Sequence, residues 1–400
     1  GSDGISYRFV KQFKFELVQP LTWLINKSIV CGTFPPQWKR AKITPIWKSK
    51  GKRSSAESYR PIGLTSSFGK IVEMAIRSQI QTNLEEKGLL PDGMHGFRKN
   101  RGTNSAITEV LDRVKEAKSR GLKVMIVALD ASCAFDLVHR PLLLQNLKAI
   151  GAGNRVIAWF TEYLNKRTSQ VAIEGEVSEE WHTDTGVIQG APLSPDEYNI
   201  VSISLPLWVR KKAIDVANIQ YADDGVSVIT AESIEECEEK AQVVINSLVD
   251  WFRATGLSLN AAKSEMIGFG FNPRPLMAGD DRIVASDKIK FLGVQIQSHL
   301  MWDLQVKNVA RQIRLSANRI RHEGRHLKIS DRRILYNSWI NGRILSNGLA
   351  YLPWITKTQV QKLQLACNQG IRSVAGLPRK STQSVSKARV ALKIHSVAAT

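Results

Sequence analysis

The sequence predicts an α+β protein, in which a small sheet lies among helices and a mostly helical region follows it. Three observations favour this class. KVMIVALD, residues 123–130, is a continuous apolar run typical of a fully buried strand. In NIQYADDGVSVIT, residues 218–230, Asp-Gly stands between alternating apolar residues, a pattern typical of a β-hairpin. Beyond residue 300 the apolar periodicity is mostly helical.

The composition indicates a globular protein that binds a polyanion. Of 400 residues, 43% are hydrophobic and 23% charged, and this length suits two or three domains. Lys and Arg number 56 against 36 Asp and Glu, which gives a net charge of +20. Nucleic acid is the expected partner rather than a membrane, because no run of about 18 apolar residues occurs. The four cysteines form no C-x-x-C pair, so we expect an intracellular protein without a disulfide framework.

The first 120 residues predict helices and a short strand. An apolar helix precedes Pro35-Pro36, and a strand follows around residues 43–47. Residues 105–120 predict an amphipathic helix, with one apolar face formed by Ile107, Val110, Leu111 and Val114.

Three further helices are predicted between the buried strand and residue 260. HRPLLLQNLKAIG, residues 139–151, ends in a glycine C-cap. Another helix covers residues 194–212, where Ser194 is the expected N-cap, Pro195 is at N1 and Glu197 completes a capping box. A third runs from about 233 to 254, and TGLSLNAAKSEMIGF after it predicts turn, strand, turn, strand.

The last hundred residues are basic. Lys307, Arg311, Arg314, Arg321 and Arg325 fall near one helical face, opposite Val309, Ile313 and Ile320. After Glu323 the only acidic residue is Asp331, against thirteen Lys and Arg. A solvated face normally mixes charges of both signs, so this excess predicts contact with a polyanion.

HEGRH, residues 322–326, matches the H-E-x-x-H pattern of zinc proteases. A zinc site needs a third protein ligand, and downstream there is no Glu and only His395. Gly324 and Arg325 also weaken the helix and repel a cation, so we interpret the segment as part of the basic helical region.

Three carboxylates stand at strand ends: Asp130, Asp223 and Asp224. A lone aspartate there most often caps the next helix. Three at the same ends of neighbouring strands would repel one another unless a metal lay between them. Two Mg²⁺ ions held in this way stabilise the attacking and leaving oxygens of phosphoryl transfer, so the pattern favours a nucleotidyl transferase.

The chain resembles reverse transcriptases, most closely those of non-LTR (long interspersed, target-primed) retrotransposons. The likeness covers roughly residues 20–300 and continues diffusely to about 380. It is carried by seven motifs in family order: SYRPIGLTSSFGKIVE, MHGFRKNRGTNSAI, VALDASCAFD, GVIQGAPLSP, YADDGVSVI, GLSLNAAKSE and IKFLGV.

This resemblance implies a right-hand polymerase with a ferredoxin-like palm sheet. Residues 1–123 would form an N-terminal extension and the fingers, and residues 124–300 the palm, with a fingers excursion at about 145–185. The thumb would cover residues 301–345, and a helical basic extension residues 346–400.

The resemblance also implies the catalytic residues. Asp130 and Asp223 would bind two Mg²⁺ ions directly, with Asp224 assisting, and Mn²⁺ could substitute. Lys263 occupies the position of a lysine suited to protonating the pyrophosphate leaving group.

The nucleotide pocket is implied in the same way. Phe135 would be the aromatic gate that excludes a 2′-hydroxyl. Gln189 would line the pocket beside the template, together with Gly190 and Ala134. Arg60 would clamp the triphosphate, and Lys52 or Arg53 is a further candidate for that role.

Template and primer contacts are expected from three places. Arg98 and Arg101 would face the template or the triphosphate, and Phe291-Leu292-Gly293 would form the turn that grips the primer. The basic face with Lys307, Arg311 and Arg314 would follow the duplex backbone.

The sequence departs from the family pattern at two places. The usual Pro-Gln-Gly-Ser reads Ile188-Gln189-Gly190-Ala191, and the family is generally apolar where Asp196 and Glu197 stand. Neither change removes a group that performs chemistry.

The expected function is RNA-directed DNA synthesis from a primer 3′-hydroxyl, with RNA template, DNA or RNA primer and dNTPs as partners. A group II intron-type maturase and a catalytically silent RNA-binding protein of the same fold are the alternatives. An RNA-dependent RNA polymerase is a third, against which Phe135 argues. We expect a ribonucleoprotein of the cytoplasm and nucleus with no secretion signal or transmembrane segment; the sequence leaves the oligomeric state open.

Overall fold

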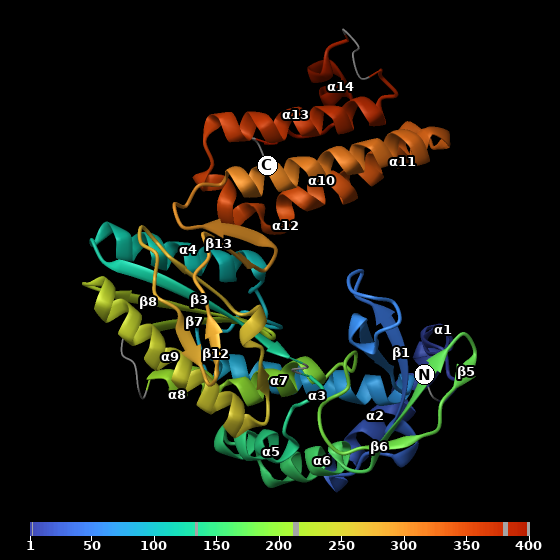
Figure 1. Cartoon of the computed structure of the whole chain (residues 1–400). Coiled ribbons are helices and arrows are strands. Elements are labelled where there is room, and N and C mark those ends of the chain that lie inside the picture. The colour runs from blue at the N-terminus through green and yellow to red at the C-terminus, as the bar shows by residue number, and fades with distance from the viewer. Residues whose placement is uncertain (2, 133–134, 211–215, 379–382, 398–400) are drawn as a thin grey trace. The chain divides into compact units, whose positions relative to one another are not determined.

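Two sheets organise the chain, one in each of two units, in a computed structural model that describes residues 1, 3–132, 135–210, 216–378 and 383–397. The first unit contains Gly1–Asp92, Asp130–Lys212 and Asn246–Asn260, and the second contains the rest. Both units contain helices and strands, and the second unit ends in a run of helices, which fits the predicted α+β class (Figure 1).

The sheet of the first unit has the order β2-β1-β4-β5, and β6 pairs with β4. β1 is antiparallel to β2 and parallel to β4. Its strands are β1 (Arg40–Trp47), β2 (Tyr59–Leu64), β4 (Arg167–Ile173), β5 (Glu176–Val177) and β6 (Trp181–Thr183).

Helices and an aromatic cluster form the rest of the first unit. The helices are α1 (Tyr7–Gln12), α2 (Lys14–Cys31), α3 (Ser67–Glu86), α5 (Arg140–Ala149), α6 (Asn154–Leu164), α7 (Ser194–Ser202) and α8 (Ser204–Arg210). Trp159 stacks on Tyr163 with ring centroids 5.0 Å apart, and Phe34 meets both rings edge-on. Such pairs add to the free energy of burial, so they fix α6 against the loop after α2.

The sheet of the second unit has the order β10-β3-β8-β7. Its strands are β3 (Lys123–Ser132), β7 (Val216–Tyr221), β8 (Asp224–Ala231) and β10 (Glu265–Gly268). In chain order they are the first, second, third and fourth strands of a β-α-β-β-α-β succession, so the spatial order 4-1-3-2 is the ferredoxin-like one that was expected.

One apolar core joins this sheet to the C-terminal helices. It includes Ile107 and Val110 of α4 (Thr103–Ser119), Val226 and Val228 of β8, and Ile313 of α10. Two hairpins, β11–β12 (Leu276–Ala278, Asp281–Ile283) and β13–β14 (Lys288–Phe291, Val294–Gln297), follow this sheet along the chain. The remaining helices are α9 (Ile234–Thr255), α10 (Asp303–His322), α11 (Ile329–Tyr336), α12 (Gly342–Tyr351), α13 (Lys357–Val374) and α14 (Val385–Ala391), and α13 packs along α10 (Figure 1).

Most predicted elements are confirmed, and one predicted cap is wrong. α4, α5 and α9 lie where periodicity predicted helices, but α7 begins after Leu193 rather than with a Ser194 cap. The Leu193 carbonyl accepts the first helical N–H bonds from Asp196 and Glu197. The Glu197 side chain is buried instead of reaching back to the helix N-terminus, so no capping box forms.

No helix in the described part of the chain has the length and apolar character needed to cross a membrane.

Candidate active site

The β7–β8 hairpin carries two of the three predicted carboxylates. Tyr221 pairs with Asp224, so the loop consists of Ala222 and Asp223, and Gly225 lies within β8. The turn therefore lies two residues before the predicted Asp-Gly pair, Asp224-Gly225. Ala222 has φ of 55°, in the left-handed region that a residue with a Cβ adopts only at a cost in free energy. Asp223 lies in the loop and Asp224 is the first residue of β8, and both residues are exposed.

Asp130 lies on β3, the strand next to β8 in the sheet. It is half-buried, and its carbonyl accepts a hydrogen bond from the Asn260 N–H at 2.9 Å. Among the residues that the structure describes, no three His, Cys, Asp or Glu side chains are grouped as a metal site.

The Gly93–Gly96 segment explains why the hairpin turns at Ala222. It extends along β7: the Gly93 carbonyl accepts from the Gln220 N–H and the Gln220 carbonyl accepts from the His95 N–H, both at 2.8 Å. A Cβ on Gly96 would overlap the Ala222 nitrogen, and one on Gly93 would overlap the Asn218 carbonyl. Backbone approaches this close are open only to glycine, so the segment fixes the hairpin tip from its edge.

His95 anchors that segment to α4. Its ring is buried, with Nδ1 2.8 Å from the Ser105 hydroxyl and Nε2 2.8 Å from Glu109 Oε2. The bond to His95 lowers the pKa of Glu109, with help from Arg113. Sequence reasoning missed this triad, although the spacing of Ser105 and Glu109 on one helical face was available as a signal.

In the first unit, the segment with Gln189 packs against β2. The Gly63 N–H donates to the Gln189 carbonyl at 2.7 Å, and a Cβ on Gly63 would overlap Ile188. Gly190 has φ of 105°, which glycine alone adopts readily. The Gln189 Oε1 is buried and accepts no hydrogen bond from the described residues.

β2 and the loop before it carry the predicted triphosphate contacts. Arg60 is exposed on β2, paired with Ile46 of β1. Lys52 and Arg53 lie in the loop between β1 and β2, where the Arg53 guanidinium stacks 4.7 Å above the Trp47 ring.

Phe135 stacks on Tyr198 of α7, with ring centroids 5.4 Å apart and planes 23° apart. Its carbonyl accepts from the Val187 N–H at 2.8 Å, which ties the ring to the segment that leads to Gln189. Ala134, also predicted for this pocket, lies outside the described residues.

Asp196 and Glu197, the two acidic departures at the start of α7, are both buried next to side chains of other elements. Asp196 is 3% exposed and binds Arg77 and Gln81 of α3. Glu197 is 1% exposed beside Glu73, and burial raises the pKa of Glu73 to about 7 and of Glu197 to about 8. The Glu73 charge contributes to the Glu197 shift, and the guanidinium of buried Arg167 opposes both.

Lys263 is exposed in a 3₁₀ turn, Ala261–Lys263, just before β10. β9 (Ser258–Leu259), which precedes this turn, pairs with the last residues of β3. Lys263 therefore lies four residues beyond a strand bonded to the end of β3, where Asp130 is found.

The remaining predicted contacts lie in the second unit. Arg98 and Arg101 are half-buried, and Arg98 Nη1 donates to the Met94 carbonyl at 3.1 Å. Phe291 pairs with Val294, so Leu292 and Gly293 form a two-residue loop. On α10 the exposed basic face is formed by Lys307, Arg311 and Arg314.

HEGRH does not form a metal site. Glu323 pairs with Arg319 at 3.2 Å, and Arg325 Nε donates to His326 Nε2 at 2.8 Å. The Nε2 atom of His326 therefore already has a protein partner, the Arg325 guanidinium.

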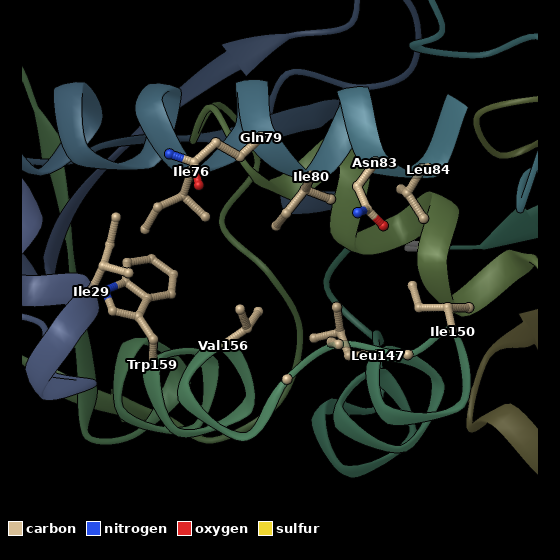
Figure 2. A pocket seen from close by; sticks show the side chains of 13 residues that line it. Ile29, Ile76, Gln79, Ile80, Asn83, Leu84, Leu147, Ile150, Val156 and Trp159 are labelled. Carbon is tan, nitrogen blue, oxygen red and sulfur yellow. The ribbon is translucent and has the colours of Figure 1, made fainter. Parts of the chain in front are cut away.

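A cavity of about 230 Å³ lies in the first unit, between α2, α3 and α6 (Figure 2). Figure 2 shows Ile76, Ile80, Val156 and Trp159 around it, with Gln79 and Asn83 on the α3 side. None of the predicted site residues lines this cavity.

Comparisons with known proteins give one consistent result. The family described as reverse transcriptase (RNA-dependent DNA polymerase) matches residues 48–296, more than half of the chain. The chain is 24% identical to the RNA-directed DNA polymerase from mobile element jockey of Drosophila melanogaster, over 94% of the chain and 42% of that protein. It is 23% identical to the probable RNA-directed DNA polymerase from transposon BS of the same species, over 94% of the chain and 43% of that protein. The chain thus spans less than half the length of these relatives.

Among solved structures, apo telomerase from Candida tropicalis matches with a TM-score of 0.52 and 13% identity, covering 94% of this chain and 66% of that chain. This likeness shows the fold, which is the right-hand polymerase fold predicted from the sequence.

Proposed function

Because the chain belongs to the reverse transcriptase family, we propose that it is the RNA-directed DNA polymerase of a non-LTR retrotransposon. It copies an RNA template by joining dNTPs to a primer 3′-hydroxyl. The observation that carries the proposal is the placement of Asp223 in the β7–β8 loop, beside the strand that bears Asp130, within a family-matched segment.

The carboxylates fit the metal ions that such a reaction uses. Asp223 and Asp224 are exposed and Asp130 is half-buried, so solvent reaches all three residues. Mg²⁺ prefers carboxylate oxygens and keeps several waters, and Mn²⁺ accepts the same ligands. Asp130 and Asp223 would hold the two ions, and Asp224 would support them. Bound in this way, the ions stabilise charge on the attacking and leaving oxygens.

The chain's own residues orient the reactants and protonate the leaving group. The primer 3′-hydroxyl gives its proton to solvent water as its oxygen bonds to the α-phosphorus, while the bond from that phosphorus to the bridging oxygen of pyrophosphate breaks. Lys263, exposed in the turn after β9, donates a proton to the departing pyrophosphate.

The nucleotide lies between groups of the first unit. Phe135, stiffened by its stack on Tyr198, lies beneath the sugar and excludes a 2′-hydroxyl. The buried Oε1 of Gln189 and the backbone of Gly190, where φ is 105°, line the pocket beside the template. Arg60, with Lys52 or Arg53, neutralises the triphosphate.

Template and primer bind through phosphate contacts. The exposed Lys307, Arg311 and Arg314 follow the duplex backbone, Arg98 and Arg101 face the template, and the turn at Phe291-Leu292-Gly293 holds the primer. The telomerase of Candida albicans, whose structure in complex with a telomeric RNA fragment has a TM-score of 0.51 to this chain, binds RNA on a related fold.

The proposed regions follow the motif order. Residues 1–123 form an N-terminal extension and fingers, residues 124–300 the palm, residues 301–345 the thumb and residues 346–400 a basic extension. The protein acts inside the cell, in the cytoplasm and nucleus, as a complex with its RNA.

Extension of a DNA primer on an RNA template tests the proposal. With Mg²⁺ and dNTPs we expect incorporation that depends on template sequence, and rNTPs should be used far less efficiently. Equal use of rNTPs would identify an RNA polymerase instead. RNA binding without incorporation of either substrate, in Mg²⁺ and in Mn²⁺, would identify a silent binding protein.

A further inference from the structure

The turn between β13 and β14 is held in a strained conformation. Leu292 has φ of 46° and Gly293 has φ of 85°, so both loop residues of this two-residue hairpin are left-handed. Glycine adopts this conformation freely, whereas leucine adopts it only at a cost in free energy. Strain of this kind persists where neighbouring groups fix the backbone.

Asn347 of α12 is the side chain that fixes it. Its Nδ2 donates to the Leu292 carbonyl at 2.8 Å, and its Oδ1 accepts from the Thr103 hydroxyl at 2.8 Å. A carbonyl can only accept, so the amide nitrogen must face Leu292, and the oxygen is then left for Thr103. These two contacts therefore determine which amide atom of Asn347 is the nitrogen and which is the oxygen.

The glycine in the turn permits this arrangement. A Cβ on Gly293 would lie 3.3 Å from the Asn347 Nδ2, closer than ordinary side-chain packing allows. Gly293 thus supplies the left-handed backbone and also leaves room for the amide above the turn.

A second asparagine ties the same helix to α4. The Asn104 Nδ2 donates to the Ser346 carbonyl at 3.1 Å and lies 3.5 Å from the Leu345 carbonyl. Thr103 and Asn104 open α4, two and three residues after Arg101. Asn347 of α12 therefore connects the start of α4 to the β13–β14 turn.

We propose that Asn347 is a positioning residue for primer binding, which holds the Leu292-Gly293 turn against the start of α4. This inference rests on the proposed function, in which that turn contacts the primer. With the amide in place, the strained turn needs no reorganisation when the primer binds. Without the Asn347 contact, the Leu292 backbone can move to a less strained conformation. Primer binding must then restore the turn, which weakens the affinity for the primer.

The test compares two binding constants for each variant, measured by anisotropy in Mg²⁺ without nucleotide. One probe is a DNA primer annealed to a longer RNA, and the other is the same RNA alone. Asn347→Asp keeps the acceptor for Thr103 but turns an oxygen towards the Leu292 carbonyl. Thr103→Val removes the hydroxyl that orients the amide, and Thr103→Ser restores it. Asn341→Ala is the matched control, because the Asn341 amide binds only Asn337 among the described contacts.

We expect Asn347→Asp to weaken primer–template binding by about fivefold or more, the factor that corresponds to one hydrogen bond. Binding of the RNA alone should change by less than about twofold. Thr103→Val should show the same selective loss, with recovery in Thr103→Ser. A merely structural role would weaken both probes together, and that result would overturn the inference, as would unchanged primer–template binding in both variants. Wild-type primer extension is scored separately, so a failure of the proposed function is distinguished from a failure of this inference.

Discussion

Arg77 and Asp196 form a hydrogen-bonded ion pair, in which the Arg77 Nε donates to the Asp196 Oδ2 at 2.7 Å. Gln81 Nε2 donates to the other carboxylate oxygen at 2.7 Å. The pair joins α3 to the start of α7, where the sequence has the acidic residues expected to depart from the family pattern. The acidic departure in the sequence is thus compensated by two polar residues on another helix.

Removing the arginine should destabilise the fold. Arg77→Met would leave the Asp196 carboxylate buried without its cation, and we expect the free energy of unfolding to fall by about 2–4 kcal/mol. The double variant Arg77→Met/Asp196→Leu, which replaces the pair by apolar groups, should recover most of that loss. Urea unfolding measures both. Arg253→Met removes an exposed partner of Asp250 at 3.9 Å and should change stability by less than about 0.5 kcal/mol. A single variant as stable as wild type would show that the pair contributes nothing.

Ionisation of Glu197 should make the free energy of unfolding fall as the pH rises towards 8. Burial raises the pKa of Glu197 to about 8 and of Glu73 to about 7, both above the value of 4.5 expected in the unfolded chain. Burial disfavours the ionised carboxyls in the folded protein, so the fold is most stable while they are protonated. That stability is fully present below pH 4.5 and is lost progressively as the pH rises through the folded pKa values of about 7 and 8.

Glu197→Gln should therefore unfold less readily than wild type at pH 9, by on the order of 3 kcal/mol, with a smaller difference at pH 6. Urea titrations at the two pH values measure this. Glu86→Gln, an exposed change on the same helix as Glu73, should leave the pH dependence as in wild type. If the Glu197→Gln protein lost stability with pH as steeply as wild type, the buried carboxyls would not be the cause.

Gly96→Ala should move the hairpin that carries Asp223. The new Cβ would overlap the backbone nitrogen of Ala222, which cannot rotate away, so the loop must shift. We expect the polymerisation rate to fall at least tenfold in a protein that still folds, with a loss of about 1–3 kcal/mol in stability. Gly342→Ala is the control, because its nearest neighbour is 3.7 Å away and alanine suits a helix. Unimpaired extension by the Gly96 variant would argue against a fixed hairpin tip.

Phe135→Val should relax sugar selectivity. The ring is held by its stack on Tyr198, so a smaller side chain opens the space that a 2′-hydroxyl would occupy. Steady-state extension with one dNTP and the matching rNTP should show the ratio of their kcat/KM values falling by about tenfold or more. Tyr198→Leu, which removes the support but keeps Phe135, should give a weaker change in the same direction. Selectivity equal to wild type in the Phe135 variant would refute the gate role.

Local sequence patterns predicted the positions of helices and strands better than they predicted turns and long-range side-chain contacts. The apolar run of β3 and the amphipathic face of α4 appear at the predicted residues, because burial imposes a period that a short window reveals. The turn at Ala222 could not be predicted in that way, since Gly96, 126 residues earlier, fixes which residues form the loop. The partners of Glu197 and Asn347 are also remote, on α3 and α4, and no local pattern distinguishes these side chains from surface polar residues.

The most direct test of the account is single-nucleotide incorporation by wild type and Asp223→Asn, with an RNA template, a DNA primer and Mg²⁺. Asparagine keeps the size of the side chain and removes the charge proposed to bind the metal. Asp223 lies in an exposed loop, so the substitution should not unfold the protein. We predict that wild type extends the primer, and that the variant retains less than about 1% of the rate while binding the template with nearly unchanged affinity. Substantial residual activity, or loss of activity together with loss of template binding, would contradict the assignment of Asp223 as a metal ligand.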